Sequence, residues 1–294
     1  MKKYKPYLNR VDLVKNQVER EELREQEAKR KRSRSIQEQN KQRWLKYQEQ
    51  LRSELAARYF HSVMSTGGES FSNTQSLLFD GIDDFVRVAN DASINFASEF
   101  SVSMWFKTTS SNVMYAITHG SSSEIKYLIQ FYAPINRIRL QIFDVSNVAT
   151  IIDNTQVFND GQWHHLAFTT DGTTTSDKVI VYFDGSPLTN KGTLSNNGIR
   201  LTTLSLSIGQ VPNTARFNGN IDEVALFNSE LSSTDITSIY NGNGAGKPGD
   251  LASLNPVSWW RFEEGSGTTA TDSGTGGNNG TLLGGPTYST DIPG

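Results

Sequence analysis

Alternation of apolar and polar residues is the main pattern of this chain, and the stretch from Asp160 to Phe168 shows it most clearly. Asp160-Gly161 predicts a tight turn, because glycine accepts a positive φ without steric cost. In the strand that follows, successive side chains point to opposite faces. One face would carry His164, Leu166 and Phe168, and the other Trp163, His165 and Ala167. Both faces carry large groups, so we expect a central strand of a layered β-domain.

Similar alternating stretches, separated by turn signals, continue through residues 76–262. We expect strands at Ser76–Asp80, Phe85–Val88, Phe100–Lys107, Val113–His119, Lys126–Tyr132, Arg137–Phe143, Ala149–Ile152, Trp163–Thr170, Lys178–Asp184, Leu204–Gly209, Ile221–Phe227 and Val257–Phe262. A short helix is expected after Ser232, which can cap it, and Asn241-Gly242 would end it. So many strands without alternating helices favour an antiparallel sandwich.

Residues 1–65 follow a different pattern and predict a helical arm. Residues 11–60 contain neither Gly nor Pro and are rich in good helix formers. Apolar positions recur at helical spacing only near the two ends of this stretch, which is too sparse for a continuous coiled-coil seam. We expect the arm to bind a partner, or copies of itself, through Val11, Val14, Val18, Trp44, Tyr47, Leu51 and Leu55.

Charge separates the arm from the rest of the chain. Residues 1–65 hold 17 Lys and Arg against 9 Asp and Glu, whereas residues 66–294 hold 11 against 22. The run from Lys29 to Arg34 could contact phosphates, but a solvated helix face is the simpler interpretation, and we expect no nucleic-acid partner. Residues 66–74 break the composition and predict a linker. We therefore expect three segments: the arm at 1–65, the linker at 66–74 and the sandwich at 75–294.

Composition excludes some kinds of site and bears on the location of the protein. The chain has no cysteine, so disulfides and thiolate sites are excluded. The N-terminus lacks the apolar run of a secretory signal, and no stretch is long and apolar enough to predict a membrane span. We therefore expect no membrane partner, and an exterior location would require another route out of the cell.

Five motifs in order resemble the laminin-G-like, concanavalin A-like jelly-roll domains. They are Ser76–Val86 with its Phe79-Asp80-Gly81, Phe100–Lys107, Asp160–Phe168, Val181–Gly185 and Phe217–Val224. Trp259–Asp272 resembles a segment that often precedes the Phe-Asp-Gly strand in this family, yet here it comes last. We expect a circularly permuted sandwich that residues 255–294 close, with Phe79 near Thr281. The alternative is a truncated second repeat, for which 40 residues are too few.

Some relatives of this fold hydrolyse glycans with a Glu-x-Asp-x-x-Glu strand motif, which this chain lacks. Asp222-Glu223 and Glu263-Glu264 are adjacent pairs, so in a regular strand their side chains would point to opposite faces. We therefore expect a protein that is not an enzyme and has no catalytic residues.

A lectin-like surface is the sharper hypothesis. If the outward residues of the strands line up, they would form one polar and aromatic face for a glycan. The members of this face would be Trp105, Arg139, Trp163 and His165. The alternative is that loops or the C-terminal segment cover these aromatic residues as a second core.

Calcium is the one metal that the resemblance implies, as a structural ion. Carboxylates are available in the turns at Asp83, Asp84, Asp91 and Asp272. These residues are also ordinary turn formers, so the sequence defines no ligand set. No other cofactor is expected.

The C-terminal run from Trp260 to Asp291 is similar to the ends of virion proteins of marine tailed phages, particularly cyanophages. This resemblance implies a structural protein of the virion exterior: an appendage, fibre or decoration made in the host cytoplasm. The arm would anchor it to other virion proteins and would form a homo-oligomer. The sandwich would adhere to host-surface glycans. The alternatives are a free carbohydrate-binding module and a glycan hydrolase.

Overall fold

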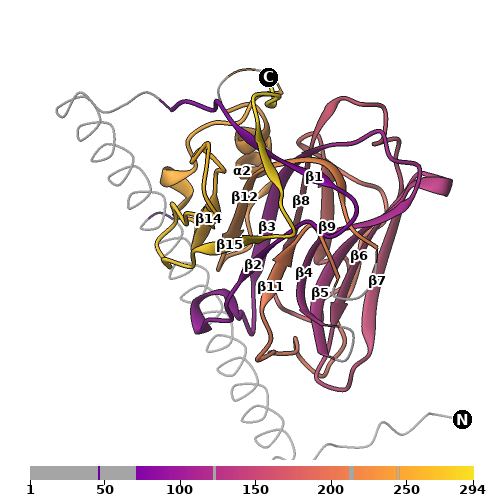
Figure 1. The fold of residues 1–294 in the computed structure, drawn as a ribbon. Helices are drawn as coiled ribbons and strands as arrows, with labels where there is room; N and C mark the ends of the chain where they lie inside the picture. Colours follow the sequence, from indigo (N-terminus) through magenta and orange to yellow (C-terminus); the bar gives the residue numbers. More distant parts are fainter. Residues whose placement is uncertain (1–45, 47–70, 122–123, 212–214, 243, 245) are drawn as a thin grey trace, which may run out of the picture. The chain divides into compact units, whose positions relative to one another are not determined.

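A computed structural model describes residues 46, 71–121, 124–211, 215–242, 244 and 246–294. The chain divides into two compact units, Met1–Gly68 and Glu69–Gly294. The second unit is the sandwich in Figure 1. The expected helical arm, with its seven partner-binding residues, lies outside the described residues apart from Lys46, which is helical.

The fold of the second unit is mainly β, with two antiparallel sheets that form a sandwich. Sheet A has the strand order β10-β9-β8-β3-β12-β1-β16, and β13 also pairs with β12. Its strands are β1 (Ser76–Asp80), β3 (Phe100–Lys107), β8 (Trp163–Thr170), β9 (Val179–Phe183), β10 (Ser186–Pro187), β12 (Asn218–Phe227), β13 (Ser258–Trp260) and β16 (Thr287–Ser289). The expected central strand, β8, lies inside this sheet between β3 and β9.

Sheet B has the strand order β14-β15-β2-β11-β4-β5-β6-β7. Its strands are β2 (Phe85–Val88), β4 (Val113–Ser121), β5 (Glu124–Tyr132), β6 (Arg137–Phe143), β7 (Ala149–Thr155), β11 (Leu206–Ile208), β14 (Thr269–Ala270) and β15 (Gly280–Leu283). Short 3-10 turns connect some of the strands of both sheets, at η1 (Ala92–Ile94), η2 (Ala133–Ile135) and η3 (Ala252–Leu254).

The expected helix is α2 (Ser233–Tyr240). Ser232 is its N-cap, and a reciprocal capping box with Asp235 satisfies donors that the first turn would otherwise leave free. Asn241 is the C-cap, as the Asn-Gly signal predicted. Among the described residues no helix combines the length and apolarity needed to cross a membrane.

Residues 255–294 supply strands to both sheets, as predicted. β13 pairs with β12 and β16 pairs with β1 in sheet A, while β15 pairs with β2 in sheet B. Figure 1 shows the yellow C-terminal strands β14 and β15 beside the indigo β2. Thr281 pairs with Arg87 on β2 of sheet B, whereas Phe79 pairs with Gly219 on β12 of sheet A, so strand pairing does not join Phe79 to Thr281. The segment is therefore part of the sandwich and forms no separate lobe.

Alternation along each strand places every second side chain in the core between the sheets. The inward residues of β3, β6 and β8 are almost fully buried in one cluster. They are Val102, Met104, Phe106, Ile138, Leu140, Ile142, Leu166 and Phe168. Phe106 is central to the aromatic packing, with its ring centroid 4.5 Å from that of Phe131 on the opposite sheet. Burial of these side chains is the main stabilising contribution to the fold.

A second apolar cluster covers the outer face of sheet A. Ile236 and Ile239 of α2 pack with Ala167 and Tyr182 of the sheet, and with Trp259 of β13. One outer face of the sandwich is therefore a second core, and it is unavailable as a continuous ligand surface.

Candidate functional site

The predicted glycan surface of Trp105, Arg139, Trp163 and His165 is not formed as one surface. Trp105 and His165 are neighbours on β3 and β8, but they are 1% and 0% exposed. The Tyr240 ring of α2 stacks on Trp105, with ring centroids 5.5 Å apart. These two residues are therefore covered in a second core, as the alternative expected, although Tyr240 of helix α2 covers them where loops or the C-terminal segment were expected.

The other two predicted residues lie elsewhere. Trp163 is half-buried at the start of β8, where its Nε1 donates a hydrogen bond to Asp291 Oδ1 at 2.9 Å. Arg139 lies on β6, which belongs to sheet B. Parity shows on which face of its own sheet a side chain lies, but it does not show to which sheet the strand belongs. The outward faces of sheets A and B point away from each other, so the four residues cannot meet.

The outward face of sheet B does carry a row of polar and aromatic side chains around Arg139. Strand register places Tyr115, Gln130, Arg139 and Asp153 side by side across β4, β5, β6 and β7. A second row, one pleat further along, contains Tyr132 opposite Arg137. We call these six residues the platform.

Hydrogen bonds fix the shape of the platform. Gln130 Nε2 donates to the Tyr115 hydroxyl at 3.0 Å. Arg139 makes a bidentate pair with Asp153, with Nε–Oδ1 and Nη2–Oδ2 distances of 2.6 and 2.8 Å. Arg137 Nη1 adds a third donor to Asp153 at 3.2 Å. Two guanidinium groups around one carboxylate leave the platform with a net positive charge and with donors still free to bind a ligand.

The electrostatics agree with this geometry. The hydrogen bond from Arg139 lowers the pKa of Asp153 below its usual value, so this carboxyl is ionised at neutral pH. Burial raises the pKa of the Tyr115 hydroxyl, which stays neutral and can donate or accept. Tyr132 is 39% exposed, so part of its ring is accessible to a ligand. The platform therefore offers aromatic surface, hydroxyl and guanidinium groups together, while Gln130, at 8% exposed, holds the Tyr115 hydroxyl.

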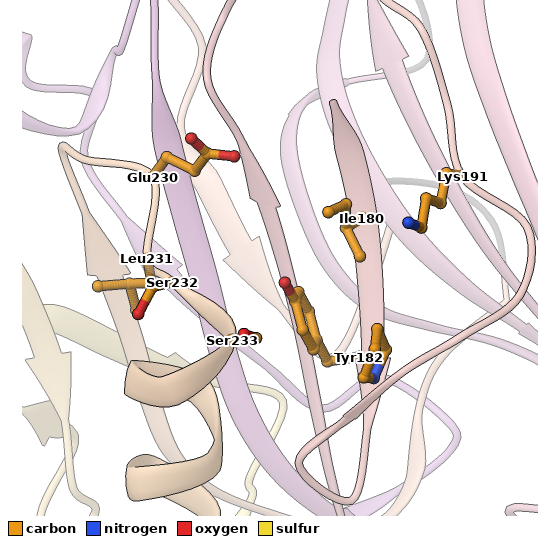
Figure 2. A pocket seen from close by; sticks show the side chains of 8 residues that line it. Ile180, Tyr182, Lys191, Glu230, Leu231, Ser232 and Ser233 are labelled. Atoms are coloured by element: carbon orange, nitrogen blue, oxygen red, sulfur yellow. The ribbon is translucent and has the colours of Figure 1, made fainter. Parts of the chain in front are cut away.

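A groove of about 460 Å³ lies on the sheet A side, between β9 and the segment before α2. Figure 2 shows Glu230 on one side of it and Lys191 on the other, with Tyr182 between them. Ile180 and Leu231 add apolar lining. Tyr182 is only 3% exposed, so its ring face is not available for stacking. The groove is a weaker candidate than the platform for a sugar ring.

The adjacent acidic pairs serve the structure. Thr74 donates to Glu263 through both its backbone N and its hydroxyl, at 2.8 and 2.5 Å. Asn73 Nδ2 donates to Asp222 Oδ2 at 2.9 Å, and Arg261 Nη2 donates to the Ser72 carbonyl oxygen. Residues 71–74, which we expected to be linker, are thus bonded to the sandwich.

Asp222 and Glu223 depart from the predicted alternation. A β-bulge at this point of β12 gives Glu223 a φ of +48°, and both carboxyls belong to one buried cluster. Trp259 Nε1 and Arg261 Nε both donate to Glu223. Burial raises the pKa of both carboxyls, that of Glu223 to about 8. Every one of their oxygens has a protein donor, which indicates a structural cluster.

Three of the four predicted calcium carboxylates are engaged by backbone N–H groups, and one of them is Asp84, whose Oδ2 accepts from the backbone N of Asp80 at 2.8 Å. Asp91 caps η1, and Asp272 accepts from the backbone N of Trp259 and of Asn278 at 2.7 Å each. Asp83 and Asp84 do come together with Asp80, with one oxygen of each within 4.8 Å of the others. Burial raises the pKa of Asp84, and the neighbouring carboxylates add to the effect. Oxygen ligands of this kind suit Ca²⁺, so this turn is where such an ion would bind.

Comparison with known proteins agrees with the architecture. Residues 80–237 match a laminin G family model described as the concanavalin A-like lectin/glucanases superfamily, which is more than half of the chain. The chain belongs to this superfamily. A comparison with curated protein sequences gave no match.

Two solved structures share the lectin/glucanase fold with this chain. One is a "putative carbohydrate binding protein" from Bacteroides ovatus, at 16% identity and a TM-score of 0.57. The match covers 76% of this chain and 62% of that protein, so the chain spans less than two thirds of its length. The other is the heptameric SAP-like pentraxin of Limulus polyphemus, at 15% identity and a TM-score of 0.53, with coverages of 74% and 95%. At these identities the likeness shows the fold alone.

Sequence reasoning found only Arg139 of the platform as a site residue. The other five residues, Tyr115, Gln130, Tyr132, Arg137 and Asp153, were not predicted as site residues. Alternation within each strand could have placed them outward. It could not show that these residues form two adjacent rows, because the rows depend on the register between paired strands.

Proposed function

We propose that the sandwich is a non-enzymatic carbohydrate-binding domain and that the platform on sheet B is its ligand surface. The observation that carries the proposal is the aligned row of Tyr115, Gln130, Arg139 and Asp153, flanked by Tyr132 and Arg137. Membership of the lectin/glucanases superfamily supports it. The Bacteroides ovatus protein with this fold, itself described as binding carbohydrate, supports it as well.

The chemistry of a sugar fits this surface. The apolar face of a pyranose ring can pack on the accessible part of Tyr132, while hydroxyls bind the guanidinium groups. Asp153 holds both guanidinium groups in place before a ligand arrives, which reduces the side-chain entropy lost on binding. The excess of donors favours glycans rich in oxygen acceptors, including acidic ones.

The test is a glycan array followed by titration of the best glycan with the full chain. Tyr132→Ala and Arg137→Ala are expected to weaken binding about tenfold each, corresponding to about 1.4 kcal/mol. Arg200→Ala is the matched control, because Arg200 bonds Asn147 in a loop away from the platform and its loss should leave affinity unchanged.

Two results would contradict the assignment. If both platform variants bind like the wild type while Glu230→Gln loses binding, the ligand occupies the groove beside Tyr182 and not the platform. If no glycan binds the folded protein at all, carbohydrate binding itself is wrong. Circular dichroism of each variant separates loss of binding from loss of folding.

We further propose that residues 1–65 anchor this domain to a virion, with the platform available to host-surface glycans. The support is in the sequence: a strongly basic arm without Gly or Pro over residues 11–60, joined to an acidic body. The resemblance of residues 260–291 to phage virion proteins adds to it. The alternative is a free carbohydrate-binding module, in which the arm would have no partner.

Deletion of residues 1–60 tests the anchor. We expect the truncated protein to fold and keep its glycan affinity, because the sandwich is a compact unit beginning at Glu69. Incorporation into particles, measured by mass spectrometry of purified virions, should be lost. Incorporation at the wild-type level without the arm would disprove the anchoring role.

A further inference from the structure

Lys126 is a lysine buried inside the sandwich, at 0% exposed. It lies on β5 next to an irregularity in the pairing with β4, where the register shifts between His119 and Gly120. Gly120 has a φ of +113°, and a Cβ there would lie 2.0 Å from the Glu124 carbonyl oxygen. Bulges of this kind redirect side chains, and here the lysine is directed into the protein.

The contacts of the Lys126 amine are unusual for a lysine. Nζ lies 5.3 Å from the ring centroid of Phe96 and 5.7 Å from that of Phe100. Among the ion pairs of the described residues, none joins Lys126 to a carboxylate. Burial lowers the pKa of this amine to about 7, so a large fraction is the neutral, nucleophilic form at neutral pH.

Asn95 faces this amine, with its Oδ1 3.2 Å from Lys126 Nζ. Thr202 holds the carboxamide from both sides: its backbone N–H donates to Oδ1 at 3.3 Å, and its carbonyl oxygen accepts from Nδ2 at 2.6 Å. The Thr202 N–H is therefore placed to stabilise negative charge that develops on Oδ1. The geometry holds a nucleophile beside a fixed carbonyl group, which is the arrangement that favours an intramolecular reaction.

We propose that Lys126 and Asn95 form an intramolecular isopeptide bond. The Lys126 Nζ attacks Cγ of Asn95, an Nζ–Cγ bond forms and the Cγ–Nδ2 bond breaks. One amine proton is transferred to Nδ2, which leaves as ammonia. No electrons are lost or gained, and no co-reactant is needed. The product ties β5 to the connection between β2 and β3, in which Asn95 lies, and so cross-links the chain between residues 95 and 126.

The intact mass of the purified, folded full chain tests the bond directly. The cross-linked protein should be about 17 Da lighter than its sequence predicts, the mass of one ammonia. Trypsin should no longer cut after Lys126, so peptides 88–107 and 108–137 should appear as one branched species. A folded protein that keeps the full sequence mass after days at pH 8, and is cut after Lys126, overturns the proposal.

Variants confirm which atoms react. Lys126→Met and Asn95→Ala should each retain the full mass expected for their sequences, whereas Lys191→Met, at a lysine on the surface groove, should still lose ammonia. The bond should also raise the melting temperature of the wild type above that of Lys126→Met, because a cross-link restricts the unfolded chain. The wild-type mass decides the question even if a variant fails to fold.

Discussion

Replacement of Trp260 by alanine is expected to destabilise the sandwich by about 3–5 kcal/mol, which is a large part of the stability of a typical domain. Trp260 is 0% exposed and packs in the main core, although it comes from the C-terminal segment. Its Nε1 donates to the Asn278 carbonyl oxygen at 2.9 Å. Alanine would leave a cavity and an acceptor without its partner. Urea unfolding followed by circular dichroism gives the free energy of unfolding.

Trp163→Ala is the matched control for this experiment. Trp163 is half-buried at the start of β8, and its loss should cost about 1 kcal/mol or less. If the two variants are equally stable, residues 255–294 do not complete the core, and the permuted sandwich is wrong. The comparison therefore tests the role of the C-terminal segment more directly than its deletion would.

Two buried histidines should make the protein sensitive to acid. Burial lowers the pKa of His119 to about 3 and that of His165 to about 4, from the usual 6.5. Between these values and 6.5 the unfolded chain binds more protons than the folded chain, so stability falls as pH falls through this window. For His165 alone the loss by pH 4 is on the order of 3 kcal/mol.

His165→Gln should remove that part of the acid sensitivity. Its free energy of unfolding should decline less than that of the wild type between pH 6.5 and 4, as measured by urea unfolding at each pH. An unchanged slope would show that His165 is not buried in the neutral form.

His164→Gln is the control, because the contribution of His164 to stability should have the opposite pH dependence. Burial alone would lower the pKa of His164, but hydrogen bonds to Asp184 and Asp160 outweigh it and raise this pKa. The contribution of His164 is therefore present at low pH and is lost as pH rises through the raised pKa. Its replacement should cost most stability in acid.

The strands and the helix of the sandwich followed from local patterns in the sequence. Alternation places apolar groups every second residue, and a strand buries them on one face. This rule gave β8 with Leu166 and Phe168 on one face, and both lie in the core. The Ser232 cap and the Asn-Gly stop fixed α2 for an equally local reason, because they satisfy backbone groups at its two ends. The short β10, β14, β15 and β16 were missed, since a strand of two to four residues shows little period.

Tertiary structure decided what surrounds each outward residue. Trp105 and Arg139 follow the same alternation, yet Tyr240 covers Trp105 on sheet A while Arg139 remains accessible on sheet B. Bulges decided two further cases: they brought Asp222 and Glu223 into one cluster and turned Lys126 into the protein. The sequence by itself determined the elements and their apolar faces, because those depend on near neighbours in the chain. Sheet membership, register and bulges depend on contacts between distant segments, and only the folded chain brings these together.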